Sequence, residues 1–238
     1  MSPSLTTPFD AAQDLADAPR SAGPRQRLKD AATLILVRGG NHPQVLMGRR
    51  APGHVFMASK WVFPGGRIDR SDFAAASATE PSAATRTRLE TEVAPHRARA
   101  LCLTAVRETF EETGLILGRP APTASVAGPW REFRQAGALP DLAALDYVAR
   151  AITPPGRTRR FDARFFMADA SALLEPEPTA GSGELDEIAW LPLEEARALD
   201  LPSITRFVLT EVAERLSHRD RPVPFVRMVR GTHLVTHG

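Results

Sequence analysis

The sequence has only one cysteine, no long apolar run and no signal-like N-terminus, and each of these absences excludes a class of protein. Cys102 is the only cysteine among 238 residues, so an intrachain disulfide is excluded and a reducing compartment is expected. No apolar run approaches the ~20 residues that a membrane-spanning helix needs. The N-terminus also lacks the basic and then apolar profile of a secretory signal. These absences predict a globular cytoplasmic protein without a membrane partner.

Neither positive nor negative charge is in clear excess. Thirty Lys and Arg residues stand against 28 Asp and Glu residues, which leaves a formal net charge of +2. This near-neutral balance gives no support to nucleic-acid binding. Lys29 and Lys60 are the only lysines, so nearly all the positive charge is arginine. The planar guanidinium group suits phosphate because it donates two parallel hydrogen bonds, although an arginine-rich composition can also reflect coding bias.

Hydrophobic patterning predicts one domain of class α+β. Residues 1–28, rich in Pro, Ser and Ala, are expected to form a flexible arm, and residues 29–238 a single domain. Short apolar runs predict extended segments at 31–39, 44–50, 60–69, 159–168, 184–192 and 223–231. Helical periodicity predicts helices at 82–93, 97–114, 130–137, 140–151, 193–199 and 203–218. These elements follow no regular βαβ rhythm, which favours α+β.

The stretch "RETFEETG" places three glutamates on one side of a predicted helix. Glu108, Glu111 and Glu112 lie within about 100° of one another on a helical wheel. The residue four positions after Glu108 is another glutamate, and Arg107 is the only cation close to them on the helix itself. The face is therefore either solvated surface or a site that holds a cation. Mg²⁺ and Mn²⁺ prefer carboxylate oxygens, which makes them the expected ions.

A glycine pair precedes this helix in "KWVFPGGRID". Gly65 and Gly66 permit backbone angles that other residues resist and allow main chain to approach an ion closely. Together, "PGGRID" and "RETFEETGL" resemble the Nudix box, which joins a glycine loop and a spacer with an acidic residue to Arg-Glu-x-x-Glu-Glu-x-Gly and an apolar residue. The second half matches at every fixed position: Arg107, Glu108, Glu111, Glu112, Gly114 and Leu115.

The first half of the box departs from the usual pattern. Asp72 stands six positions after Gly66, where the family usually has Glu. Between Asp72 and Arg107 lie 34 residues, where the usual pattern has seven, so about 27 are inserted. An interrupted box resembles the coenzyme A diphosphatase-like branch of the superfamily, as do "KWVFPGGRIDRSDF" and "ARAITPPGRTRRFDARFF". We expect the insertion, at about 73–97, to form a surface excursion that leaves loop and helix in contact.

The resemblance implies a Nudix fold, in which a mixed β-sheet is sandwiched between α-helices. It also implies a metal-dependent hydrolase that cleaves a phosphoanhydride bond. Mg²⁺ or Mn²⁺ would be held by Glu108, Glu111 and Glu112, with the Gly65 carbonyl as a further ligand. Arg107 would act in the catalytic group, chiefly by orienting the glutamates. Glu111 would also belong to this catalytic group.

The resemblance also implies a general base that comes from a different loop. Glu184 is favoured over Asp186 and Glu187 because it follows the flexible "GSG", although a surface role for all three is equally open. The substrate's phosphates have three candidate partners in "TPPGRTRRFD": Arg157, Arg159 and Arg160. As a basic cluster beside a turn, these arginines can equally be solvated surface.

The expected partner is a small-molecule nucleoside diphosphate derivative. Coenzyme A or an acyl-CoA is the first choice, because of the interrupted box. One alternative is a pyrophosphatase for ADP-ribose or NADH, which would share the metal site. A second is a nucleotide-binding Nudix module without catalysis; such modules usually lose box glutamates, and all three are present here. The sequence leaves the oligomeric state open.

Overall fold

The computed structural model describes residues 9–10, 26–50, 59–179 and 183–237, so nearly all of the expected arm at 1–28 lies outside it. The strands are β1 Lys29–Arg38, β2 Gln44–Arg50, β3 Trp61–Val62, β4 Gly65–Arg67, β5 Gly118–Pro120, β6 Ala138–Pro140, β7 Asp146–Ile152, β8 Phe161–Asp169, β9 Leu185–Pro192, β10 Pro224–Val229 and β11 Thr232–His237. The α-helices are α2 Ala83–Glu90, α3 Pro95–Thr113, α4 Arg131–Gln135, α5 Leu193–Ala198 and α6 Ser203–Ser217. The 3₁₀ helices are η1 Arg70–Phe73, η2 Leu142–Ala144 and η3 Ala170–Ala172.

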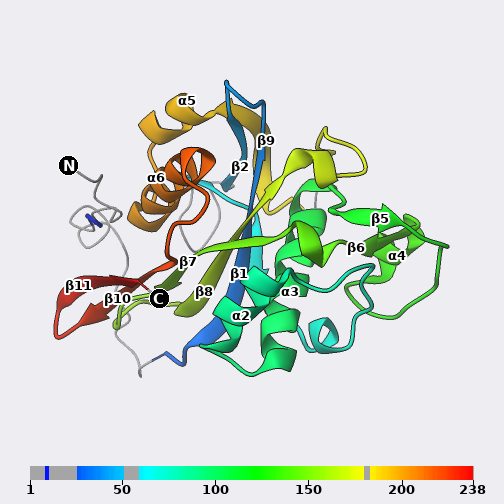
Figure 1. The fold of residues 1–238 in the computed structure, drawn as a ribbon, viewed down its shortest axis with the longest axis horizontal. Helices are drawn as coiled ribbons and strands as arrows, with labels where there is room; N and C mark the ends of the chain where they lie inside the picture. Colours follow the sequence, from blue (N-terminus) through cyan, green and yellow to red (C-terminus); the bar gives the residue numbers. More distant parts are fainter. Residues whose placement is uncertain (1–8, 11–25, 51–58, 180–182, 238) are drawn as a thin grey trace.

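A mixed sheet forms the centre of the molecule, with helices on both faces (Figure 1). Its strand order is β11-β10-β7-β8-β1-β2-β3, with β4 on β1 and β9 on β2, while β5 and β6 form a separate small sheet. β1 runs parallel to β8, and β10 runs parallel to β7. The other pairings described for this sheet are antiparallel. The predicted α+β class and mixed sheet are confirmed.

The sequence of β1 explains why both faces of the sheet are covered. Leu34 and Leu36 pack into one buried cluster with α3, whereas Ile35 and Val37 pack into a second cluster with α6. Successive side chains of a strand point to opposite faces, so a strand buried on both sides reads as a continuous apolar run. Figure 1 shows α2 and α3 on one side of the sheet and α5 and α6 on the other.

The prediction of a helix at 140–151 is wrong. This stretch ends β6, forms η2 and then becomes β7. Its alanine-rich composition favours helix, but Tyr147, Val148 and Ala149 are buried in a strand that lies between β8 and β10. The pairing partners and burial outweigh the local propensity.

The final hairpin was missed as well. The predicted last strand, 223–231, is β10, but the chain reverses and returns as β11. Arg230 and Gly231 at the turn both have positive φ, 49° and 85°. This pair suits a tight two-residue hairpin turn, which normally carries Asn-Gly or Asp-Gly. Arg-Gly lacks that signature, so this turn could not be predicted from the local residues.

The insertion at 73–97 is tied to the core more firmly than the expected surface excursion. It contains α2 and the first residues of α3. Thr85 and Leu89 of α2 are buried, and the Thr85 hydroxyl donates a hydrogen bond to the Leu145 carbonyl at 2.8 Å. The extra residues therefore contribute packing beside β7.

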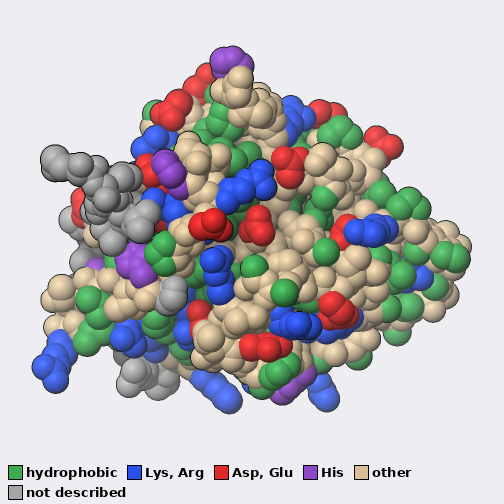
Figure 2. Space-filling view, viewed as in Figure 1, with side chains coloured by type: hydrophobic (Ala, Val, Ile, Leu, Met, Phe, Trp, Pro, Cys, Tyr) green, Lys and Arg blue, Asp and Glu red, His purple; other side chains and the backbone are tan. Residues whose placement is uncertain are grey.

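The surface in view carries both signs of charge. Figure 2 shows acidic and basic side chains interspersed across this face, without a broad area of one sign. Within the part of the chain that the structure describes, no helix has the length and apolar character that a membrane crossing requires.

A buried ion pair between α6 and the segment that follows it gives a test of the packing. Arg221 donates to both carboxylate oxygens of Glu211, at 3.2 and 3.3 Å, and its side chain also reaches Glu214 at 3.5 Å. The side chain of Glu211 is 1% exposed and that of Glu214 is 49% exposed. We expect Glu211→Ala to lower the free energy of unfolding by about 3–5 kcal/mol, because a buried cation loses its main partner.

Glu214→Ala is the matched control, since it removes a carboxylate from the same arginine at an exposed position. Its loss is expected to stay below about 1 kcal/mol. Urea unfolding measures both variants, and equal losses would contradict the assigned difference in burial.

Candidate active site

The two halves of the split motif meet in space. The Gly65 backbone N–H donates to Glu112 Oε2 at 3.1 Å, although the two residues lie 47 positions apart. β4 holds Gly65 opposite Thr33 of β1, and α3 ends at Gly114, whose φ of 73° forms a left-handed cap. The structure thus brings the glycine loop against the end of the glutamate-bearing helix, as the reading of one split motif expects.

The two glycines of the loop lie close to β1 and to the Glu108 carboxylate of α3. A Cβ added at Gly66 would lie 2.4 Å from a carboxylate oxygen of Glu108. One added at Gly65 would lie 2.6 Å from the Ala32 carbonyl oxygen. Both distances are shorter than any van der Waals contact, so the glycines let main chain and carboxylates approach closely.

Arg107 lies at the centre of the site with all five N–H groups engaged. Its Nε and Nη2 donate to the two oxygens of Asp72, at 2.9 and 3.0 Å, and Nη2 also donates to the Arg67 carbonyl at 2.9 Å. Nη1 donates to Glu108 at 2.9 Å and to Glu111 at 3.0 Å. Because a guanidinium has five donors and no more, Arg107 positions the two glutamates, and we place it outside the group that touches substrate.

Asp72, which directly precedes the insertion, is the carboxylate that Arg107 binds with two hydrogen bonds. Its carboxylate is fully buried and accepts bonds from Thr104 Oγ1 at 2.8 Å, Trp130 Nε1 at 3.0 Å and the Asp69 backbone N–H at 2.9 Å, besides those from Arg107. A buried charge is stable when it is paired and hydrogen-bonded in this way. Thr104 and Trp130 were missed from the sequence, because neither belongs to a recognisable motif.

The three glutamates differ in exposure, and burial has the largest effect on the pKa of each. The side chains of Glu108 and Glu111 are 16% and 33% exposed, whereas Glu112 as a residue is 3% exposed. Burial raises the pKa of Glu112 to about 8, against the lowering effect of the Arg50 charge. Burial likewise raises the pKa of Glu108 to about 6 and shifts that of Glu111 upward, while Arg107 opposes both changes. Carboxylates that resist ionisation in this way would be stabilised by a nearby cation.

The donor set suits a hard divalent cation. Glu108, Glu111 and Glu112 present carboxylate oxygens on one side of α3, as Mg²⁺ and Mn²⁺ require. Within the described ranges, no group of three or more acidic, His or Cys side chains forms a ready metal cage. The N–H of Gly65 faces Glu112, and metal binding by its carbonyl remains a prediction.

Glu184 lies within electrostatic reach of the glutamates. It is exposed just before β9, and its charge is among the causes that raise the pKa of Glu112. The other two candidates, Asp186 and Glu187, form ion pairs with Arg49 at 3.4 and 3.0 Å. The choice of Glu184 over these two, and its role as general base, stay predictions.

The arginine cluster is not brought to the glutamates. Arg157, Arg159 and Arg160 lie in the connection between β7 and β8. The Arg160 carbonyl accepts from the Lys29 backbone N–H at the start of β1, whereas Gly65 pairs with Thr33. Lys29 and Thr33 are four residues apart on β1, which corresponds to about 13 Å along the strand. The backbone of the arginine cluster therefore lies well away from the glycine loop. Arg160 is buried and donates to the Thr153 carbonyl at 3.2 Å, so it stabilises its own loop.

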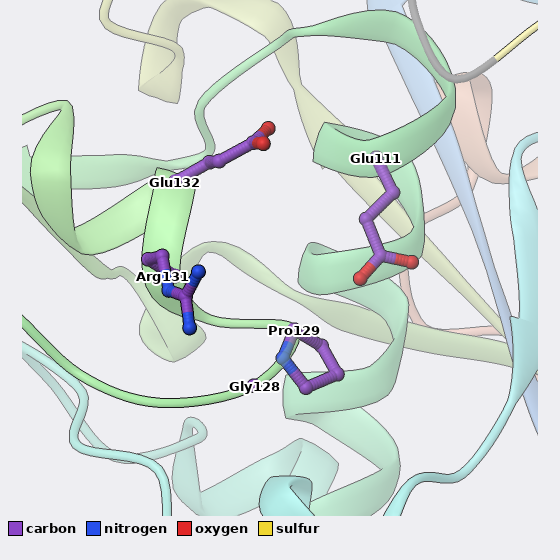
Figure 3. A pocket seen from close by; sticks show the side chains of 5 residues that line it. All are labelled: Glu111, Gly128, Pro129, Arg131 and Glu132. Atoms are coloured by element: carbon purple, nitrogen blue, oxygen red, sulfur yellow. The ribbon is translucent and has the colours of Figure 1, made fainter.

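A cavity of about 410 Å³ adjoins the glutamate helix (Figure 3). It lies between α3 and the start of α4 and is lined by Glu111, Gly128, Pro129, Arg131 and Glu132. The sequence predicted a loop followed by a short helix here but gave these residues no function.

Comparisons with known proteins agree with the fold. No family model matches the chain. It is 29% identical over 203 aligned residues to acyl-coenzyme A diphosphatase NUDT19 of Gallus gallus, which covers 61% of this chain and 52% of that protein. The chain therefore spans about half the length of this curated relative.

Solved structures give the clearest likeness. A NUDIX hydrolase from Alicyclobacillus acidocaldarius superposes with a TM-score of 0.60 and 28% identity, covering 81% of this chain and 96% of that one. The NUDIX domain of Shewanella oneidensis NrtR, complexed with ADP ribose, gives a TM-score of 0.49 and 15% identity, covering 87% and 99%.

Proposed function

We propose that the chain is a Nudix hydrolase, as its likeness to a NUDIX hydrolase structure and to the chicken relative supports, and that it acts as a metal-dependent diphosphatase whose substrate is coenzyme A or a short acyl-CoA. The main support for a metal-dependent diphosphatase reaction is the contact between Gly65 and Glu112, which joins the glycine loop to the glutamate face of α3. The substrate class is supported by the interrupted box and by the name of the chicken relative, which is an acyl-coenzyme A diphosphatase.

The reaction requires a cation because the glutamate face repels a diphosphate. When bound, Mg²⁺ or Mn²⁺ neutralises the phosphoryl oxygens and lowers the pKa of an attacking water. Glu108, Glu111 and Glu112 would hold the ion. Arg107 fixes the carboxylates of Glu108 and Glu111, and the N–H of Gly65 fixes that of Glu112.

Glu184 is assigned as the group that accepts a proton from the attacking water. The observations behind this role are its exposure and its electrostatic coupling to Glu112. A carboxylate beside a metal-bound water can act in this way when it reaches hydrogen-bond distance. With coenzyme A, the products would be 3′,5′-ADP and 4′-phosphopantetheine.

The test is turnover of four diphosphates in the presence of Mg²⁺: coenzyme A, dephospho-coenzyme A, ADP-ribose and NADH. Coenzyme A is expected to give the highest kcat/KM, with the two products above identified by mass. If ADP-ribose or NADH leads by about tenfold or more, a difference of ~1.4 kcal/mol, the coenzyme A assignment is wrong and the metal-dependent diphosphatase reading survives.

Metal removal supplies a separate prediction. An excess of EDTA is expected to abolish turnover, because the diphosphate then meets uncompensated carboxylates. Readdition of Mg²⁺ or Mn²⁺ should restore it, and Ca²⁺ serves as the control for a cation of different coordination preference. Full turnover in EDTA would contradict the proposed role of the glutamate face.

A further inference from the structure

Residues 128–132 lie across the cavity from Glu111 of α3, and we call them the facing segment. Contacts with buried residues hold this segment in place. Trp130, at its centre, is 4% exposed and donates to Asp72 Oδ1 at 3.0 Å. Its ring packs edge-on against Phe133, with 5.4 Å between centroids, and Phe133 packs edge-on against Phe110 at 5.2 Å.

These contacts tie the facing segment to α3, because Phe110 precedes Glu111 on that helix. Aromatic pairs in this geometry add stabilisation beyond the area that they bury. The segment is thereby held at a fixed distance from the residues that would bind metal, which is the condition for a preformed ligand pocket.

Two charged side chains of the facing segment border the cavity. Figure 3 shows Arg131 and Glu132 extending from the start of α4 toward the space in front of α3, with Glu111 on the far side. Both Arg131 and Glu132 are exposed. The cavity of about 410 Å³ lies within the range of about 300–1,000 Å³ that small-molecule pockets occupy.

We propose that this cavity is the subsite for the phosphorylated ribose of the substrate, with Arg131 as the residue that selects for the phosphate monoester. The inference rests on the proposed diphosphatase function. A guanidinium binds a phosphate monoester through parallel charge-assisted hydrogen bonds, and a carboxylate such as Glu132 accepts a hydrogen bond from a ribose hydroxyl. Glu111 borders both the cavity and the metal face, so a sugar in the cavity would lie next to the scissile diphosphate.

The chemistry of the lining favours a sugar phosphate over a purely anionic group. Once a metal ion engages Glu111, the remaining charges of the cavity are one positive, Arg131, and one negative, Glu132. A group that combines one phosphate with a free ribose hydroxyl satisfies both. Coenzyme A carries such a group, whereas dephospho-coenzyme A has the same ribose without the phosphate.

The kinetic test is Arg131→Gln, with turnover of coenzyme A and dephospho-coenzyme A measured side by side. The variant is expected to lose about 10- to 100-fold in kcat/KM on coenzyme A, the effect of one charge-assisted contact. Its kcat/KM on dephospho-coenzyme A should stay within about twofold of the parent. Arg219→Gln is the matched control, because Arg219 is exposed beyond the end of α6 and outside the candidate site, and it should leave the ratio of the two substrates unchanged.

Binding of product fragments gives a readout that does not depend on turnover. In Mg²⁺ buffer, calorimetry should show that the parent binds 3′,5′-ADP about tenfold or more tightly than 5′-AMP, and that Arg131→Gln loses this preference. Equal losses on both substrates, or a preference for 3′,5′-ADP that persists in Arg131→Gln, would overturn the subsite assignment.

The two proposals fail in different ways. If the parent cleaves coenzyme A but shows no dependence on Arg131, only the subsite is wrong. If the parent binds 3′,5′-ADP through Arg131 but cleaves none of the four diphosphates, the subsite stands and the proposed function fails.

Discussion

Replacing Glu112 by Gln is expected to lower kcat/KM on the best diphosphate substrate by ~10²-fold or more. The loss follows because the substitution removes a carboxylate that we propose as a metal ligand, at the point where the glycine loop meets α3. Glutamine keeps an oxygen that can accept the Gly65 N–H bond, and it removes a charge that burial disfavours. The variant should therefore stay folded, with a Tm no lower than that of the parent.

Glu90→Gln is the matched control, since Glu90 is exposed on α2 and lies outside the candidate site. Steady-state kinetics and thermal unfolding of both variants separate the two effects. A Glu112→Gln variant with the activity of the parent would remove this residue from the metal site. A variant that loses activity only because it unfolds would contradict the account of its burial.

Replacing Arg107 by Lys is expected to lower kcat/KM by about 10- to 100-fold, the usual effect of losing a residue that orients metal ligands. A lysine keeps the charge but has a single ammonium group, so it cannot bind Asp72 with two parallel bonds and also hold Glu108 and Glu111. The glutamates would then lose their orientation, and the apparent affinity for Mg²⁺ should fall.

The Mg²⁺ dependence distinguishes positioning from a general loss of stability. In Arg107→Lys, raising the Mg²⁺ concentration should recover part of the lost rate, because the defect lies in holding the ion. Arg99→Lys on the same helix is the control, since its nearest carboxylate is the exposed Glu80. A deficit in Arg107→Lys that Mg²⁺ does not change would assign the arginine a structural role alone.

Local patterns in the sequence were enough to predict the core of the site. The glutamate face follows from helical periodicity, and the contact with the glycine loop follows from the split motif. The central strands were also predictable, because a strand buried on both faces must be apolar throughout. These features depend on residues close together in the chain or on a motif that fixes their relation.

Features set by tertiary contacts could not be predicted in this way. β7 was expected as helix because its pairing with β8 and β10 cannot be read from its alanines. The bond between Trp130 and Asp72 joins residues 58 positions apart without a motif. The β7–β8 arginines were candidate phosphate ligands by composition, but Arg160 is buried and supports its own loop. The cavity beside Glu111 depends on how the facing segment folds back on α3.

The central claim is that the glutamate face of α3 holds a divalent cation, and Mn²⁺ binding followed by electron paramagnetic resonance tests it most directly. Titration of the parent protein should remove the signal of free Mn²⁺, and Mg²⁺ should compete for the same sites. Glu112→Gln is expected to bind Mn²⁺ at least about tenfold more weakly, because a carboxylate ligand is lost. Mn²⁺ binding that is absent in the parent, or unchanged in Glu112→Gln, would contradict the account.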